Sequence, residues 1–399
     1  MRALWILVVL AACKGEPAEE AAALPVEEVA PPPRDAALAR GWPELAELHA
    51  EPPQRVITLP TRNDVPRFTV GGPALVHDLA VVSSSQFGFA AVDWRRGQLM
   101  WTKPAGAHVA PPIARGEELV LIGDCLAPPA VPASHTLLGC ARIVTRTGAD
   151  QAYVAIHGPT VALATFAASA GDQRVWIEGE HAVRWRRGEA AVVVDLLTGI
   201  ATPGSAQPPP FVVEHKAKRW TISQVDGKII AAAKGKDAWR STGTYGELLG
   251  TVHLPDQTPM VRMANINAFD GNPEIRLLDM DATGSMNGTA SWTPVPGFQL
   301  LGAALSPVGD AALAVRLDRN IKRDYIAAFA ANALLIYITP LPEVMRPDPV
   351  GVAIALDETG AAEAVVAFYD GDQLAVLPNL SAPPTAPGAT AGALQNPTP

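Results

Sequence analysis

The chain has 399 residues, of which 48% are hydrophobic and 18% charged, and its formal net charge is −9. This composition is apolar enough for a large folded core. The acidic balance argues against a nucleic-acid binder, because such proteins usually present a basic face.

Residues 1–12 are predicted to be a signal peptide. Arg2 is followed by an apolar run over residues 3–10, which is too short to span a bilayer as a helix. Leu10-Ala11-Ala12-Cys13 resembles the lipobox of bacterial lipoproteins, and that resemblance implies cleavage before Cys13 and acylation of its thiol. Lys14 follows, where an Asp would imply retention in the inner membrane, so we expect a lipid-anchored protein of the bacterial outer membrane, either periplasmic or surface-exposed. An ordinary signal peptide that contains a Cys is the alternative.

Two segments lack the apolar residues needed for a core. Residues 13–54 are rich in Ala, Pro and Glu, and we predict a lipidated Cys followed by an extended tether. Residues 381–399 have a similar character and are predicted to be a disordered tail.

Residues 55–380 contain short apolar or β-branched runs separated by Gly, Pro, Asp and Asn, which predicts an all-β domain. The apolar stretch 325–338 could be a buried helix, but its place in the series favours two strands on either side of AAN (330–332). RVITLP (55–60) is the candidate for an N-terminal strand that closes the last unit.

Turn glycines recur through this domain at intervals of 51, 51, 36, 49 and 76 residues: Gly97, Gly148, Gly199, Gly235, Gly284 and Gly360. The last interval is twice 38, so one copy is expected to be degraded near residue 322, in DRNIKRD. Seven units of this length predict a β-propeller of seven four-stranded blades, within a range of six to eight.

The most complete unit shows why its residues recur. Asp93 can accept hydrogen bonds from turn amides, Gly97 can adopt a positive φ, and Trp101 on the returning strand can fill the space between blades. Gly235 and Trp239 repeat the step from glycine to tryptophan.

Ala91-Val92-Asp93-x-x-x-Gly97-x-x-x-Trp101 resembles the repeat of the quinoprotein-like (PQQ-repeat-like) β-propellers. Asp195 and Gly199 match the first half of that repeat, and Asp357 and Gly360 match its turn.

Together with the lipobox, this resemblance points to the BamB-type outer-membrane assembly lipoproteins. It implies a non-enzymatic, monomeric scaffold without a cofactor, held at the membrane through lipid on Cys13 and bound to a protein of the cell envelope. The alternative is a propeller that binds a carbohydrate or small ligand, or catalyses a reaction, in its central funnel.

Cys125 and Cys140 form an even pair once Cys13 is lipidated, and an oxidising compartment favours a disulfide between them. Two free thiols or a metal pair are the alternatives. The sequence lacks the adjacent cysteines of quinone dehydrogenases and the common hydrolase, metalloprotease and P-loop motifs, so we expect no enzyme.

The sequence offers little for a metal. Asp279 and Asp281, in DMDATGS, give alternating oxygen ligands as calcium loops do, but Ala290 stands where an EF-hand has Glu. A blade turn is therefore favoured over a calcium site. The eight histidines are scattered without ligand spacing, so none is assigned a metal: His49, His77, His108, His135, His157, His181, His215 and His253.

Overall fold

The structure is a computed structural model. It describes residues 26–29, 54–61, 69, 71–106, 108–127, 130–159, 173–186, 190–205, 209–215, 218–225, 228–233, 236–240, 247–252, 260–269, 272–281, 286–292, 299–316, 324–331, 335–341 and 350–378.

All the regular secondary structure in these described residues consists of β-strands. In chain order they are β1 (Val26–Val29), β2 (Gln54–Thr58), β3 (Ala74–Val76), β4 (Leu79–Ser84), β5 (Gly88–Asp93), β6 (Gln98–Lys103), β7 (Ile113–Arg115), β8 (Glu118–Gly123), β9 (His135–Thr145), β10 (Asp150–Pro159), β11 (Gln173–Glu178), β12 (His181–Arg186), β13 (Ala191–Asp195), β14 (Ala201–Gly204), β15 (Phe211–His215), β16 (Lys218–Val225), β17 (Lys228–Ala233), β18 (Lys236–Arg240), β19 (Glu247–Val252), β20 (Met260–Phe269), β21 (Asn272–Asp281), β22 (Met286–Trp292), β23 (Gln299–Leu305), β24 (Ala311–Arg316), β25 (Asp324–Phe329), β26 (Leu335–Pro340), β27 (Gly351–Leu356), β28 (Ala362–Tyr369) and β29 (Gln373–Pro378).

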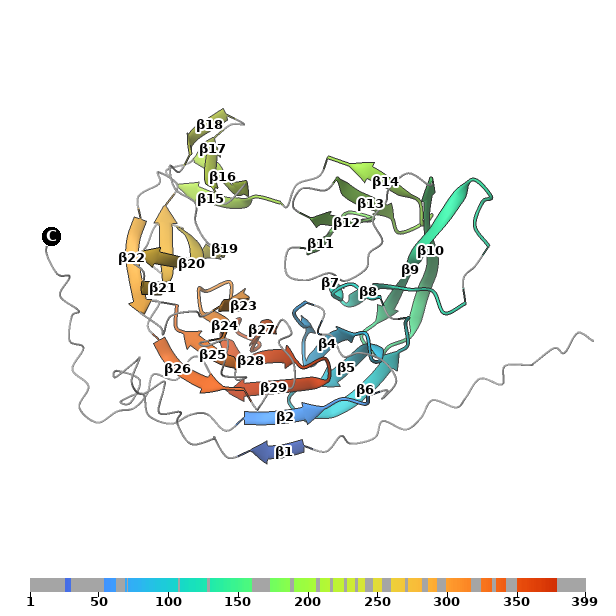
Figure 1. The fold of residues 1–399 in the computed structure, drawn as a ribbon, viewed down its shortest axis with the longest axis horizontal. Helices are drawn as coiled ribbons and strands as arrows, with labels where there is room; N and C mark the ends of the chain where they lie inside the picture. The colour runs from blue at the N-terminus through green and yellow to red at the C-terminus, as the bar shows by residue number, and fades with distance from the viewer. Residues whose placement is uncertain are drawn as a thin grey trace, which may run out of the picture.

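The strands form seven antiparallel sheets, six of four strands and one of five. Blades 1 to 6 are the consecutive groups β3–β6, β7–β10, β11–β14, β15–β18, β19–β22 and β23–β26, and blade 7 is β27–β29 with β2 and β1. The sheets are arranged around a common centre (Figure 1). This confirms the predicted all-β propeller, and the ambiguous stretch at 325–338 falls in strands β25 and β26.

The first strand of each meander lies nearest the centre. β3 contacts β27 and β7, β7 contacts β11, and β19 contacts β15 and β23. In blade 2 the inner strand β7 has three residues and the outer strand β10 has ten, which fits the wedge shape of that blade.

Blade 7 joins the two ends of the domain. β2 pairs with β29, with Arg55 opposite Val376 and Thr58 opposite Gln373. β1, which falls within the predicted tether, pairs with β2 as a fifth strand. The outer edge of β2 would otherwise leave backbone donors and acceptors unpaired, and the backbone of Val26–Val29 satisfies them.

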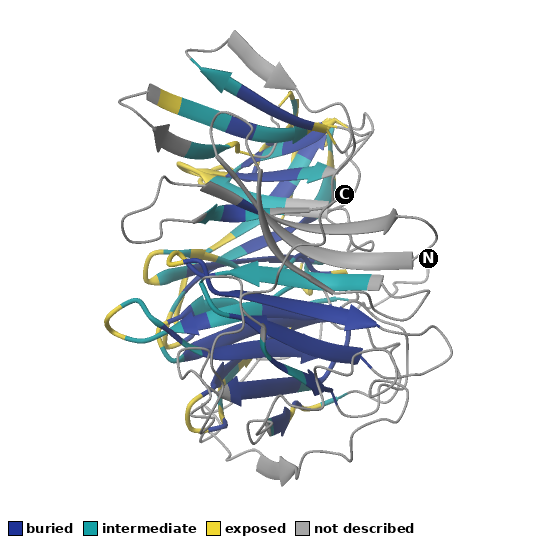
Figure 2. Ribbon diagram, turned by 90° about the vertical axis from the view of Figure 1, so that its left-hand side faces the viewer, coloured by how far each residue is buried: buried dark blue, intermediate teal, exposed yellow. Residues whose placement is uncertain are grey.

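The core consists of apolar layers between neighbouring blades. One layer joins blades 7 and 1 through Val366 and Val82, and another joins blades 1 and 2 through Val81 and Leu121. Buried residues run along the strands, whereas exposed residues gather at the turns (Figure 2). Alanine and valine predominate in strands such as β24, because small side chains let two sheets pack closely face to face.

One part of the predicted repeat register is wrong. Gly97, Gly148 and Gly199 lie between the third and fourth strands of blades 1 to 3, but Gly360 lies between β27 and β28, the first and second strands of blade 7. In blade 6 the turn between the third and fourth strands follows β25, so DRNIKRD (318–324), which comes between β24 and the start of β25, is not the degraded copy of that turn. Aspartate-glycine turns serve both positions, and strand pairing rather than local sequence distinguishes them.

Candidate functional site

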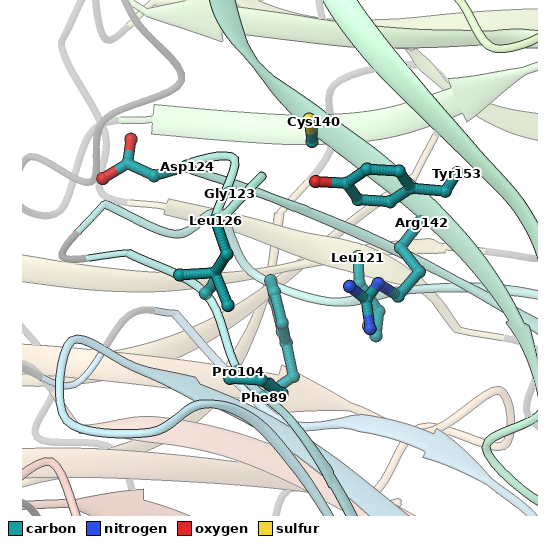
Figure 3. A pocket seen from close by; sticks show the side chains of 10 residues that line it. Phe89, Pro104, Leu121, Gly123, Asp124, Leu126, Cys140, Arg142 and Tyr153 are labelled. Atoms are coloured by element: carbon teal, nitrogen blue, oxygen red, sulfur yellow. The ribbon is translucent and has the colours of Figure 1, made fainter. Parts of the chain in front are cut away.

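A crevice lies between blades 1 and 2 (Figure 3). Its volume is about 20 Å³, which is room for roughly one water molecule. It is therefore a surface feature that a protruding side chain can contact, and it is smaller than a typical small-molecule pocket. Its walls are formed by Phe89, Pro104, Ala105, Leu121, Gly123, Asp124, Leu126, Cys140, Arg142 and Tyr153.

One wall presents an arginine beside an aromatic ring. Arg142 on β9 and Tyr153 on β10 are partners in the strand ladder, and Arg142 Cζ lies 5.1 Å from the centre of the Tyr153 ring, a cation–π contact (Figure 3). Asp150 lies nearby, with its Oδ1 3.8 Å from Arg142 Nε and 3.2 Å from Lys103 Nζ. Tyr153 is 41% exposed, so the stacked pair of Arg142 and Tyr153 faces solvent.

The opposite wall is fixed by a disulfide. Cys125 and Cys140 are bonded, with their Cα atoms 5.1 Å apart, which confirms the predicted pair. Leu126 follows Cys125 directly and is 56% exposed, on the other side of the crevice from Tyr153 (Figure 3). The bond ties this leucine to β9 and restricts the loop that carries it.

The strand end before the disulfide is held by a second set of bonds. Asp124 Oδ2 accepts hydrogen bonds from the His108 backbone N at 3.1 Å and pairs with His108 Nδ1 at 3.0 Å. Asp124 N in turn donates to His108 O at 2.9 Å. The segment that connects blade 1 to blade 2 is thereby joined to the end of β8, so the crevice has a rigid frame.

This arrangement is suited to contact with another macromolecule. The charged lining residues, Asp124 and Arg142, each have a side-chain partner, and Leu126 and Tyr153 add exposed apolar and aromatic surface. Aromatic residues and arginine supply a large share of the binding energy at protein interfaces.

The repeat aspartates lie at turns and accept hydrogen bonds from turn amides. Asp93 Oδ1 accepts from Arg96 N at 2.9 Å, and Asp195 Oδ1 accepts from the backbone N atoms of residues 197 and 198. The bond from Thr198 N contributes most to holding the pKa of Asp195 below its ordinary value. The Thr359 hydroxyl does the same for the pKa of Asp357.

In blades 2 and 3, the turn between the third and fourth strands contacts the preceding blade. Trp101 on β6 donates from Nε1 to Arg146 O at 3.0 Å, and a Cβ on Gly148 would meet the indole Cγ at 2.7 Å. Gly199 in blade 3 sits against β10 of blade 2, where His157 N donates to Gly199 O at 2.9 Å. Trp101 therefore lies between two blades, as its place in the repeat predicts.

Several sequence predictions fall outside the described residues. These include Cys13 and Gly235, and the side chains of Trp239 on β18 and of Asp279 and Asp281 on β21. Lipid attachment and the choice between a calcium site and a blade turn stay predictions.

Within the described ranges, no group of three or more His, Cys, Asp or Glu side chains is placed to hold a metal ion. Those ranges also contain no helix long and apolar enough to cross a bilayer.

No family model matches the chain, and no curated protein matches it. Solved structures that resemble it include BamB from Moraxella catarrhalis, at 11% identity over 83% of this chain and 95% of that chain with a TM-score of 0.38. The β-propeller domain of Cps50 (Swd1) from Myceliophteria thermophila is 9% identical over 82% of this chain and 100% of that chain, with a TM-score of 0.44. Virginiamycin B lyase from Staphylococcus aureus is 11% identical over 82% and 99%, with a TM-score of 0.41. At these values the similarities carry no functional argument.

Sequence reasoning missed the residues that give the crevice its character. Arg142 and Tyr153 meet only because the β9–β10 hairpin pairs them, and Leu126 becomes prominent because the adjacent Cys125 is bonded to Cys140. The hairpin turn at Gly148 was a usable signal, since residues at similar distances before and after it lie near one another across the two strands.

Proposed function

We propose that this chain is a non-enzymatic, lipid-anchored propeller of the bacterial cell envelope that binds a protein partner through the crevice between blades 1 and 2. The observation that carries this proposal is the exposed pair Leu126 and Tyr153 on a frame held by the disulfide and by Asp124.

The energetic argument rests on preorganisation. Association is costly when side chains and loops must become ordered on binding, and a surface that is already fixed avoids much of this cost. Arg142 is held by Asp150 and stacked on Tyr153, while Leu126 is tied to β9 by the neighbouring disulfide. A partner can therefore pack an apolar side chain against Leu126 and Tyr153 without first ordering them.

The cellular part of the proposal is supported by the N-terminal sequence. The lipobox ending at Cys13 and the Lys14 that follows it favour an outer-membrane lipoprotein. The partner to test first is accordingly the machinery that assembles outer-membrane proteins. The non-enzymatic part rests on the lack of catalytic motifs in the sequence.

The test is affinity purification from crosslinked native envelopes, followed by mass spectrometry. The informative variant is Leu126→Ala with Tyr153→Ala, and its matched control is Val225→Ala with Val308→Ala, which truncates exposed apolar residues on blades 4 and 6. Loss of one hot-spot residue costs about 2 kcal/mol or more, so recovery of the partner should fall by roughly tenfold or more in the first variant and stay unchanged in the control.

Two results would contradict the proposal. Equal loss of the partner in both variants would mean that the crevice is not the docking surface. Recovery of no protein at stoichiometric amounts would reject the scaffold and direct the search to glycans and small molecules in the central funnel.

A further inference from the structure

Two histidines that are 22 residues apart in the chain meet on blade 2. His135 begins β9 and His157 lies near the end of β10. Their Nδ1 atoms are 2.7 Å apart, and their ring centres are 4.9 Å apart with 35° between the ring planes. The ladder pairs His135 with Pro159 and His157 with Leu137, so the two histidines are diagonal neighbours across the strands.

The backbone at both positions is fixed. His135 N donates to Pro132 O at 2.8 Å, and His157 N donates to Gly199 O of blade 3 at 2.9 Å. Both side chains are half-buried, so the rings are confined but solvent still reaches them. The pair is therefore preorganised and open to an ion from solution.

The contact between the two Nδ1 atoms requires one proton between them. If both atoms carried a proton the donors would repel, and if neither did the lone pairs would repel. Burial, and then the neighbouring His135, lower the pKa of His157.

We propose that His135 and His157 form a cross-strand binding site for a divalent transition-metal ion of the Zn²⁺ or Cu²⁺ class, coordinated through the two Nδ1 atoms with water completing the shell. The ion takes the place of the shared proton, which moves through solvent to Nε2 of the same ring, so that both imidazoles bind as neutral ligands. Imidazole suits Zn, Cu and Ni, whereas calcium and magnesium take oxygen ligands.

The geometry is close to what such an ion needs. Zinc–nitrogen bonds of about 2.0–2.1 Å at a tetrahedral angle place the two nitrogens roughly 3.3 Å apart. The present separation is 2.7 Å, so on binding the two nitrogens move apart and the rings turn until both lone pairs face the ion. By contrast, His77 pairs with Glu117 and His108 pairs with Asp124, so each of these two contacts contains a single histidine.

The experiment titrates the purified full-length chain, without a polyhistidine tag, with Cu²⁺ alone at neutral pH. Binding is followed by calorimetry, and pulsed EPR of the bound ion counts the imidazole nitrogens. Zn²⁺ is then added as a competitor. We expect one Cu²⁺ per chain with two imidazole ligands, displaced by excess Zn²⁺. No partner protein is present, so the result is independent of the proposed scaffold function.

The variants are His135→Gln and His157→Gln, with His108→Gln as the matched control, because His108 pairs with the carboxylate of Asp124 and not with a second histidine. Each of the first two should weaken Cu²⁺ binding by roughly tenfold or more, because one nitrogen donor is lost, and the control should not.

Three results would overturn the proposal: no stoichiometric Cu²⁺ binding, one imidazole on the bound ion, or binding retained in His157→Gln. Circular dichroism shows whether each variant folds. If a variant does not fold, the nitrogen count on the unsubstituted protein decides the question, since it requires no mutation.

Discussion

Replacing Gly199 by alanine tests whether the outer turn of blade 3 holds the neighbouring blade. Gly199 has a φ of +75°, and an added Cβ would lie 1.8 Å from Ala155 O and 2.8 Å from Val154 Cγ1 on β10. No side-chain rotation relieves a collision with a backbone oxygen, so the turn must move away from β10. That movement breaks the hydrogen bond from His157 N to Gly199 O, which is 2.9 Å long.

The control is Gly360→Ala. Gly360 has a φ of +84°, but a Cβ there would meet nothing within 4 Å. It therefore measures the backbone penalty alone, about 1–2 kcal/mol. Gly199→Ala carries the same penalty plus an unsatisfied backbone donor, about 1–3 kcal/mol more.

The assay is urea denaturation of both variants, monitored by circular dichroism and tryptophan fluorescence. We expect Gly199→Ala to have the lower midpoint and the free energy of unfolding to differ from that of Gly360→Ala by about 1–3 kcal/mol. Equal midpoints would refute the argument that this turn contributes to the contact between blades 2 and 3.

Three further perturbations test other parts of the structure. Replacing Cys125 and Cys140 by serine should lower the free energy of unfolding by about 3 kcal/mol, because the bond closes a loop with a sequence separation of 15; an unchanged guanidinium midpoint would contradict this. Arg316→Met should lower the free energy of unfolding by about 3–5 kcal/mol, because the fully buried Asp324 loses the ion pair in which its Oδ1 lies 2.7 Å from Arg316 Nε. Adding Asp324→Leu should recover much of that loss in the same denaturation assay. Asp195 and Asp357 have folded-state pKa values below the ordinary Asp value, so their contribution to the free energy of unfolding is present above about pH 3.9 and is lost as the pH falls through the folded-state values. The double variant Asp195→Asn with Asp357→Asn should therefore show a flatter dependence of the denaturation midpoint on pH in that acid range. An unaltered pH profile would count against this explanation.

The parts of the fold that local chemistry determines could be predicted from the sequence. Strand positions follow from short apolar runs, and turns such as Asp195–Gly199 follow from an aspartate that accepts amide hydrogen bonds and a glycine with positive φ. The closing strand could be named because RVITL is an apolar run that precedes the first complete unit.

Features that depend on long-range pairing could not be predicted in the same way. The turn at Gly360 resembles the turn at Gly199, yet it joins different strands of its blade, because the last partner of β29 comes from the N-terminus. β1 was missed because four residues of an acidic, proline-flanked segment form a strand only where β2 offers a free edge.

The crevice and the histidine pair belong to this second class. Arg142 meets Tyr153, and His135 meets His157, only after the β9–β10 hairpin has its register, including the irregularity after Ile156. Searching for ligand spacing along the chain cannot find a pair that lies across two strands.

Under the proposed lipidation of Cys13, the fifth strand of blade 7 limits how far the ring can stand from the bilayer. Cys13 and Val26 are thirteen positions apart in the chain, and a fully extended chain of that length reaches about 45 Å. Without β1 the free segment would extend to Gln54, and its reach would be about 140 Å. Pairing of β1 with β2 therefore shortens this reach to roughly a third, and in the proposed lipoprotein a pull from the membrane would act first on the backbone hydrogen bonds between these two strands.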